Sequence, residues 1–186
     1  AKRFWGSAAA PDIEIDGPAA DQQAIRSFLF PIRSAVNPLG TMGVAPMALS
    51  SSIYNGHVFW DADLWVFPAL LLLDPERAAT ISRYRLNLRD AAARNFVEQA
   101  RREGTPPVPT SAIRYPWQSS VTGTDVATPI QNRAQIHVTG SVVFALQKAA
   151  AFGLVDNDAV QRVGAGAADF YLGRSVLGPG GQRELL

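Results

Sequence analysis

Apolar side chains recur along most of this chain at the spacing of amphipathic α-helices. In the first example, over about residues 21–36, Ile25, Phe28, Leu29 and Ile32 form one apolar stripe. Pro31 lies within this stretch and is expected to kink it. Further helices are predicted over residues 60–73, 75–102, 134–152 and 158–173. The pattern therefore predicts an all-α protein.

Start and stop signals support these boundaries. Asp74 followed by Pro75 and Glu76 is typical of a helix start, with the aspartate as N-cap. Gly104, with prolines soon after it, predicts the end of the same helix. Residues 12–16 alternate like a short strand but stop at a Gly-Pro pair, so an extended lead-in is the most they predict. The glycine-rich residues 177–181 predict a turn.

Two long segments, residues 37–56 and 104–133, show no such periodicity. Loops of this length inside a compact domain are mostly functional or disordered. The second loop contains Tyr115, Trp117 and several hydroxyl side chains, which favours function over disorder.

Composition narrows the functions open to the chain. With 186 residues, 47% of them hydrophobic, it can form one domain with a sizeable core. Its 17 basic and 16 acidic residues show no concentrated basic run, so neither nucleic acid nor an anionic membrane is expected as a partner. The longest apolar stretch, residues 64–73, is too short to span a bilayer. There is no cysteine and there are only two histidines, so no metal site and no cofactor is predicted.

The segment GHVFWDADLW, residues 56–65, is the most distinctive chemistry in the chain. Indole rings stack on the apolar face of a sugar, and carboxylates accept hydrogen bonds from its hydroxyls. The alternative is a helix start whose acids favour the helix dipole. On a helix Asp61 and Asp63 point about 200° apart, so Asp63 is expected to be a structural partner of an arginine. Trp65 is expected to lie in the core.

The longer segment GHVFWDADLWVFPALLLLDPE, residues 56–76, resembles glycoside hydrolase family 65. This family includes acid trehalases, glucosylgalactosyl-hydroxylysine glucosidases and the maltose, trehalose and kojibiose phosphorylases. Further similar elements follow in the family's order: residues 12–30, Tyr84-Arg85, residues 115–119 with Thr122-Gly123, and residues 135–140. The W-D-x-D pattern is similar to the trehalase and glucosidase branch, since the phosphorylases more often have W-D-T-E.

The resemblance implies an (α/α)6 toroid, of which residues 1–186 would form the first half of the catalytic domain. It implies that Trp60 and Asp61 bind a glucosyl unit from an α-glucoside such as trehalose. His57 and His137 are expected near this site, although a satisfied structural histidine is the alternative for each. Trp117 and Gln118 are further substrate-binding candidates, with a loop anchor as the alternative for Trp117. Asp125 stands where relatives often have glutamate, and its role is left open.

No catalytic residue is expected within the chain. The family's general acid is the glutamate of a G-P-D-E-Y-H segment, which the resemblance places beyond Leu186. The parent enzyme would be an inverting hydrolase, and the isolated chain is expected to be inactive. The alternatives are a phosphorylase of the same family and a non-catalytic sugar-binding or assembly fragment. Half of a ring would leave apolar helix faces uncovered, so homo-oligomers are possible.

Overall fold

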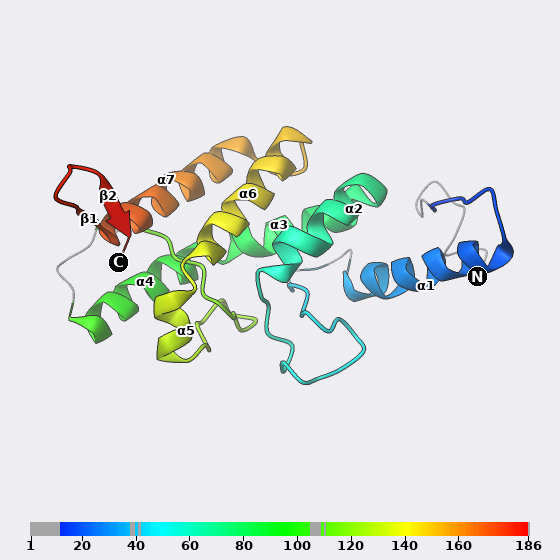
Figure 1. Ribbon diagram of the computed structural model, residues 1–186, viewed down its shortest axis with the longest axis horizontal. Helices are drawn as coiled ribbons and strands as arrows, with labels where there is room; N and C mark the ends of the chain where they lie inside the picture. Colours follow the sequence, from blue (N-terminus) through cyan, green and yellow to red (C-terminus); the bar gives the residue numbers. More distant parts are fainter. Residues whose placement is uncertain (1–11, 38–39, 41, 105–108, 110, 186) are drawn as a thin grey trace.

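The computed structural model describes residues 12–37, 40, 42–104, 109 and 111–185, and over these residues the protein is almost entirely helical (Figure 1). The helices are α1 (Ala19–Ala35), the π-helix η1 (Ala62–Val66), α2 (Phe67–Leu73), α3 (Pro75–Asn87), α4 (Arg89–Glu103), α5 (Pro129–Ala134), α6 (His137–Ala151) and α7 (Asn157–Gly173). This confirms the all-α prediction. None of the helices described is long and apolar enough to cross a membrane.

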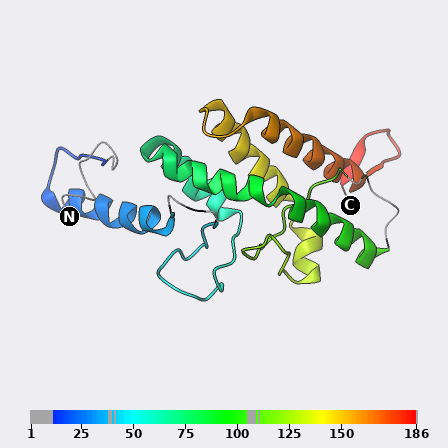
Figure 2. The same cartoon turned by 180° about the vertical axis from the view of Figure 1, so that it is seen from behind.

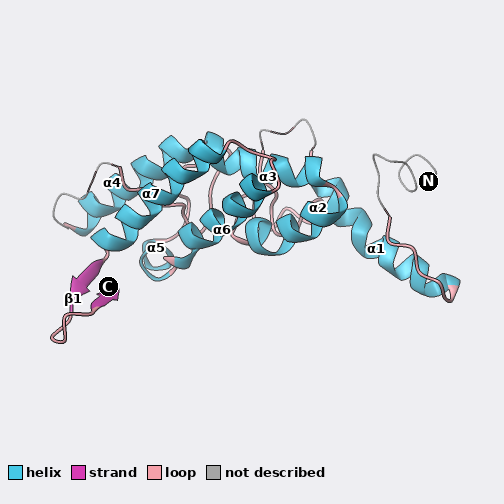
Figure 3. Ribbon diagram, turned by 90° about the horizontal axis from the view of Figure 1, so that it is seen from above, coloured by secondary structure: helices cyan, strands magenta, loops and turns pink. Residues whose placement is uncertain are grey.

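The core lies where α6 and α7 pack side by side against α2 and α3 (Figures 1 and 2). Two apolar clusters fill it. The first joins α2 and α3 to α6 through Phe67, Leu70, Ile81, Tyr84 and Ala149. The second joins α6 and α7 through Val138, Val142, Leu146, Val160 and Val163. Seen from above, the helices form an elongated, curved body with α1 at one end and a small hairpin at the other (Figure 3).

Helix α1 projects from this body, so the apolar stripe predicted for it is only partly covered. Leu29 and Arg33 are buried, whereas Phe28 is 71% exposed. Arg33 donates a hydrogen bond to Asp74 at 3.0 Å, and this ion pair ties the helix to the start of α3. The helix continues through Pro31 to Ala35. Asp74 also accepts a hydrogen bond from the Arg77 N–H, which confirms its predicted role as N-cap.

The predicted helix over 60–73 begins as a π-helix, and the core position predicted for Trp65 is wrong. Trp65 is 65% exposed and lies beside Trp60, with ring centroids 6.0 Å apart. Side chains five residues apart diverge by about 140° on an α-helix, whereas the wider π turn returns them towards one side. The π-helix ends at Val66, two residues before Pro68, which cannot donate the hydrogen bond of a regular α-helix.

The helix predicted over 75–102 is interrupted at Leu88, where α3 ends and α4 begins. The Arg85 carbonyl accepts hydrogen bonds from the Leu88 N–H at 3.2 Å and from the Tyr115 hydroxyl at 2.8 Å. These donors occupy the carbonyl that a continuous helix would offer to residue 89. At the other end of α4, Gly104 adopts a φ of 63° as the C-cap, which confirms the predicted stop.

The segment predicted as a loop over 104–133 contains α5, which the sequence analysis missed. Thr128 and Gln131 form a capping box around Pro129 at the start of this helix. The following helix begins at His137 instead of about residue 134. The predicted turn near 177–181 joins two short antiparallel strands that were also missed, β1 (Ser175–Leu177) and β2 (Arg183–Leu185).

Candidate functional site

A short backbone bridge brings the distinctive segment 56–65 against the second long loop. The Val58 and Ser119 N–H groups each donate to the other residue's carbonyl, both at 3.0 Å. Val58 is buried in the core. Its bridge to Ser119 therefore positions the second long loop next to the start of η1. The bridge places Gln118 and Trp117 beside the residues that flank Val58.

Three aromatic side chains from three separate elements meet at this point. His137, at the first position of α6, makes edge contacts with Trp60 at a centroid distance of 5.3 Å and with Trp117 at 6.0 Å. Trp117 also contacts Phe59 at 5.7 Å. Trp60 and Trp117 are half-buried and His137 is exposed, so the cluster remains accessible from solvent.

Asp61 follows Trp60 at the head of η1 and is half-buried. Its carboxylate makes no hydrogen bond or ion pair with any residue that the structure describes. Its oxygens are not among the buried atoms that lack a partner, so they remain accessible from solvent. The residue that follows Trp60 therefore offers a hydrogen-bond acceptor.

His57 and Gln118 form a pair at the edge of the cluster. The His57 Nδ1 and Gln118 Oε1 atoms lie 3.2 Å apart, within hydrogen-bond distance, and both side chains are half-buried. The structure gives His57 no hydrogen bond to Asp61. All six residues that sequence and resemblance nominated thus reach the surface on or beside one stretch of the fold.

Asp63 has the opposite environment, and its predicted pairing with an arginine is confirmed. The Arg85 guanidinium donates to Asp63 through Nε at 3.1 Å and Nη2 at 2.5 Å, and both side chains are 1% exposed. Arg85 also donates to the Phe59 carbonyl at 3.0 Å. Burial raises the pKa of the Asp63 carboxyl, while the charge and hydrogen bonds of Arg85 oppose this shift. The pair clamps both ends of the turn that carries Trp60 and Asp61.

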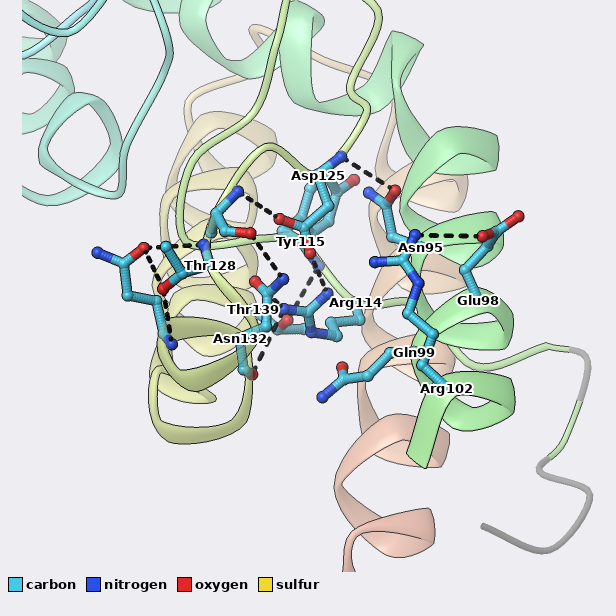
Figure 4. A network of polar contacts seen from close by, with 12 residues as sticks. Asn95, Glu98, Gln99, Arg102, Arg114, Tyr115, Asp125, Thr128, Asn132 and Thr139 are labelled. Carbon is cyan, nitrogen blue, oxygen red and sulfur yellow. Dashed lines mark hydrogen bonds and ion pairs between the residues drawn. The ribbon is translucent and has the colours of Figure 1, made fainter. Parts of the chain in front are cut away.

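A second buried arginine holds the loop over residues 111–128 in place (Figure 4). The Arg114 guanidinium donates to Asp125 at 2.8 Å and to the Asn132 side-chain oxygen at 2.6 Å. Desolvation lowers the pKa of Arg114, and the carboxylate of Asp125 opposes that shift. This pairing supplies the role that the sequence left open for Asp125.

Gly123 lets the same loop approach α4 closely. Its φ is 77°, and a Cβ at this position would lie 2.9 Å from the Cβ of Ala91. Asn95 on α4 donates to the Gly123 carbonyl at 2.8 Å. Only glycine fits both the conformation and the space, and this close approach lets the loop pack against α4.

Sequence reasoning did not assign roles to several residues that position the site. Ser119 and Arg85 were known only as parts of similar motifs, although the arginine expected for Asp63 pointed towards Arg85. Tyr54, whose ring lies 5.1 Å from that of Phe59, carried no signal in the sequence. Within the described part of the chain, no three His, Asp or Glu side chains are grouped to hold a metal ion.

The helical fold is that of the α/α-toroid class, and two half-buried indoles and an unpaired carboxylate lie on one part of its surface. Residues 26–165 match the family model for the central catalytic domain of glycosyl hydrolase family 65. The chain belongs to this family, as its motifs indicated.

Named relatives include both hydrolases and phosphorylases. The chain is 36% identical over 146 residues to a kojibiose hydrolase of Mucilaginibacter mallensis, covering 77% of this chain and 20% of that protein. It is 34% identical over 146 residues to a protein-glucosylgalactosylhydroxylysine glucosidase of Gallus gallus, covering 73% and 20%. It is 32% identical over 146 residues to an alpha,alpha-trehalose phosphorylase of Thermoanaerobacter brockii, covering 78% and 17%. The chain therefore spans about a fifth of the length of its first relatives.

A solved structure supports the fold. It is described as a candidate kojibiose phosphorylase from the human microbiome and superimposes with a TM-score of 0.66. The match covers 92% of this chain and 23% of that chain, at 23% sequence identity. At this identity the likeness concerns the fold alone.

Proposed function

We propose that this chain supplies the glucosyl-binding part of an active site that hydrolyses an α-glucoside with inversion. The observation that carries the proposal is the half-buried carboxylate of Asp61, which has no partner among the described residues and directly follows Trp60 in the chain. Trehalose is the substrate suggested by the sequence motifs. Kojibiose is added because two of the relatives are kojibiose hydrolases.

In the proposed site Trp60 stacks on the apolar face of the glucosyl ring, with His137 and Trp117 forming the adjoining wall. Asp61 accepts hydrogen bonds from the sugar hydroxyls, and these strengthen as the ring flattens towards an oxocarbenium-like state. The His57–Gln118 pair offers further polar groups at the rim.

Proton transfer is assigned to residues outside this chain. By resemblance, a protonated glutamate beyond Leu186 gives its proton to the leaving oxygen while water attacks the opposite face of the sugar. The chain alone is therefore expected to bind sugar without turning it over.

Titration of the purified chain with trehalose, kojibiose and glucose, followed by tryptophan fluorescence and NMR, tests this proposal. We expect saturable binding that Asp61→Asn and Trp60→Ala each weaken by about tenfold, the loss of one charge-assisted hydrogen bond or one stacking surface. Asp90→Asn, on the exposed face of α4, is the matched control and should leave binding unchanged.

Binding that ignores both site variants would contradict the proposed role of this surface. Glucose release by the isolated chain, abolished by Asp61→Asn, would instead show that the catalytic groups lie within it.

A phosphorylase is the second candidate, because trehalose and kojibiose phosphorylases are also among the relatives. The W-D-x-D pattern of residues 60–63 favours hydrolysis. Sugar 1-phosphate release that requires inorganic phosphate, from the protein that contains this domain, would decide for phosphorolysis. Binding with neither reaction in that protein would indicate a non-catalytic sugar-binding role.

A further inference from the structure

A separate groove, lined mainly by charged and amide residues, lies between α4 and α5 and shares no lining residue with the site at Trp60 and Asp61. Its volume is about 490 Å³, within the range of small-molecule sites. One face of α4 forms the first wall, α5 forms the second, and the loop at Thr124 and Asp125 forms part of the floor. No aromatic side chain is among its lining residues. A neutral sugar would therefore lack a stacking surface there.

Three arginines and three carboxylates line this groove, but two of the carboxylates are paired with arginines outside the lining. Each carboxylate that lines it is paired with an arginine: Glu98 with Arg102 at 3.6 Å, Glu103 with Arg174 at 3.3 Å, and Asp125 with Arg114 at 2.8 Å. Arg94 from α4 and Arg133 from α5 also line the groove. Neither guanidinium has an ion pair or hydrogen bond with a residue that the structure describes. Two positive charges, one from each wall, are left for a ligand.

A buried acceptor without a donor lies on the same wall. Gln99 is 8% exposed, and its Oε1 atom has no hydrogen-bond partner, while its Nε2 donates to Glu103 at 2.8 Å. Figure 4 shows this side chain directed from α4 towards α5. Leaving such a carbonyl oxygen unsatisfied costs about 1–3 kcal/mol. A ligand hydroxyl would supply the missing donor.

We propose that this groove binds a small polyhydroxylated anion of the sugar phosphate or sugar acid class. Arg94 and Arg133 hold its oxyanion, because guanidinium forks match phosphate and carboxylate geometry. The Gln99 amide oxygen accepts a hydrogen bond from one of its hydroxyls. The ion-paired Arg114 and Asp125 keep the floor rigid and neutral.

NMR titration of the ¹⁵N-labelled chain tests the proposal with four probes: glucose 6-phosphate, glucuronate, inorganic phosphate and glucose. We expect saturable shifts of α4 and α5 resonances with at least one of the two sugar anions and none with glucose. Arg94→Gln combined with Arg133→Gln should weaken that binding by at least about tenfold. Arg83→Gln is the matched control, since Arg83 is exposed on α3 and does not line the groove.

Gln99→Leu distinguishes recognition of the ligand's hydroxyl groups from recognition of its anionic group. It should weaken binding of the sugar anion while leaving any binding of inorganic phosphate unchanged. Whichever sugar anion binds more tightly identifies phosphate or carboxylate as the preferred group.

Three results would overturn the proposal. The first is the absence of a saturable shift with either sugar anion. The second is an equal loss of affinity in the double variant and in Arg83→Gln, and the third is binding of inorganic phosphate as tight as that of the sugar anions. The second would show diffuse charge attraction, and the third would show that the groove does not recognise the hydroxylated part. Thermal unfolding of each variant, followed by circular dichroism, confirms that the fold is retained.

Discussion

Asp61 and Asp63 are two residues apart in the sequence, yet the fold gives them opposite environments. Asp63 is fully buried against Arg85, whereas Asp61 remains half-buried at the surface. The two residues differ because a separation of two residues is about half a helical turn, which directs their side chains to opposite sides. The buried Asp63 orients the turn at residues 59–63 through Arg85. The carboxylate of Asp61 is accessible to a ligand.

Removing the charge of Asp63 should destabilise the protein strongly. Asp63→Asn leaves the Arg85 guanidinium buried without its counter-charge, so we expect a loss of about 3–5 kcal/mol in the free energy of unfolding, measured with urea. Asp90→Asn removes a partner from the exposed Arg89–Asp90 pair and should cost at most about 1 kcal/mol. Equal losses in the two variants would contradict a structural role for the buried pair.

The buried Tyr115 hydroxyl should make stability depend on alkaline pH. Burial raises the pKa of Tyr115 above its ordinary value of 10.0. Above about pH 10 the unfolded chain therefore loses this proton while the folded protein keeps it. Stability falls as pH rises, by up to about 1.4 kcal/mol per pH unit. Urea unfolding between about pH 8 and 11 should show a smaller decline in Tyr115→Phe; an unchanged decline would assign the effect to other groups.

At the scale of single elements, one glycine of α7 allows the loop at residues 111–113 to pack closely against the helix. The Gly166 carbonyl accepts a hydrogen bond from the Ile113 N–H at 2.9 Å, which docks the loop onto the helix. A Cβ on Gly166 would lie 2.7 Å from both the Ile113 side chain and the Ser111 carbonyl, whereas a Cβ on Gly164 would contact nothing within 4 Å. Packing therefore requires glycine at position 166 but not at position 164.

These glycines provide a matched pair of substitutions. Gly166→Ala should lower the free energy of unfolding by about 1–3 kcal/mol through overpacking. Gly164→Ala should raise it by about 0.5–1 kcal/mol, because alanine is the better helix former and the space is open. Thermal and urea unfolding of both variants measure the difference. A loss from Gly164→Ala as large as that from Gly166→Ala would contradict the packing described.

At the scale of the whole molecule, the exposed apolar side chains predict self-association. Phe28, Trp65 and Leu72 are 71%, 65% and 78% exposed, and such surface is costly to leave in water. Sedimentation should show species that grow with protein concentration, and Phe28→Gln should reduce them. Gln23→Ala, at an exposed position of the same helix, is the control. A monomer at every concentration tested would contradict this expectation.

Much of this architecture could be predicted because it rests on local chemistry. The N-cap at Asp74, the stop at Gly104 and the stripe of α7 are decided within one or two helical turns, where capping and periodicity act. The break at Leu88 and the π-helix that contains Trp65 were not predicted. The break depends on the Tyr115 hydroxyl, which is distant in the sequence. The π-helix lies just before Pro68, where a regular α-helical hydrogen bond cannot form.

The sequence by itself determined the helical class, the family and the residue types of the sugar-binding candidate, because periodicity and a dense motif are written within short stretches. Only the tertiary structure decided which of those residues meet. His137 joins Trp60 and Trp117 because the Val58–Ser119 bridge and the Arg85 and Arg114 pairs bring three distant segments to one point. Such pairings depend on long-range closure of the chain, which no local pattern encodes.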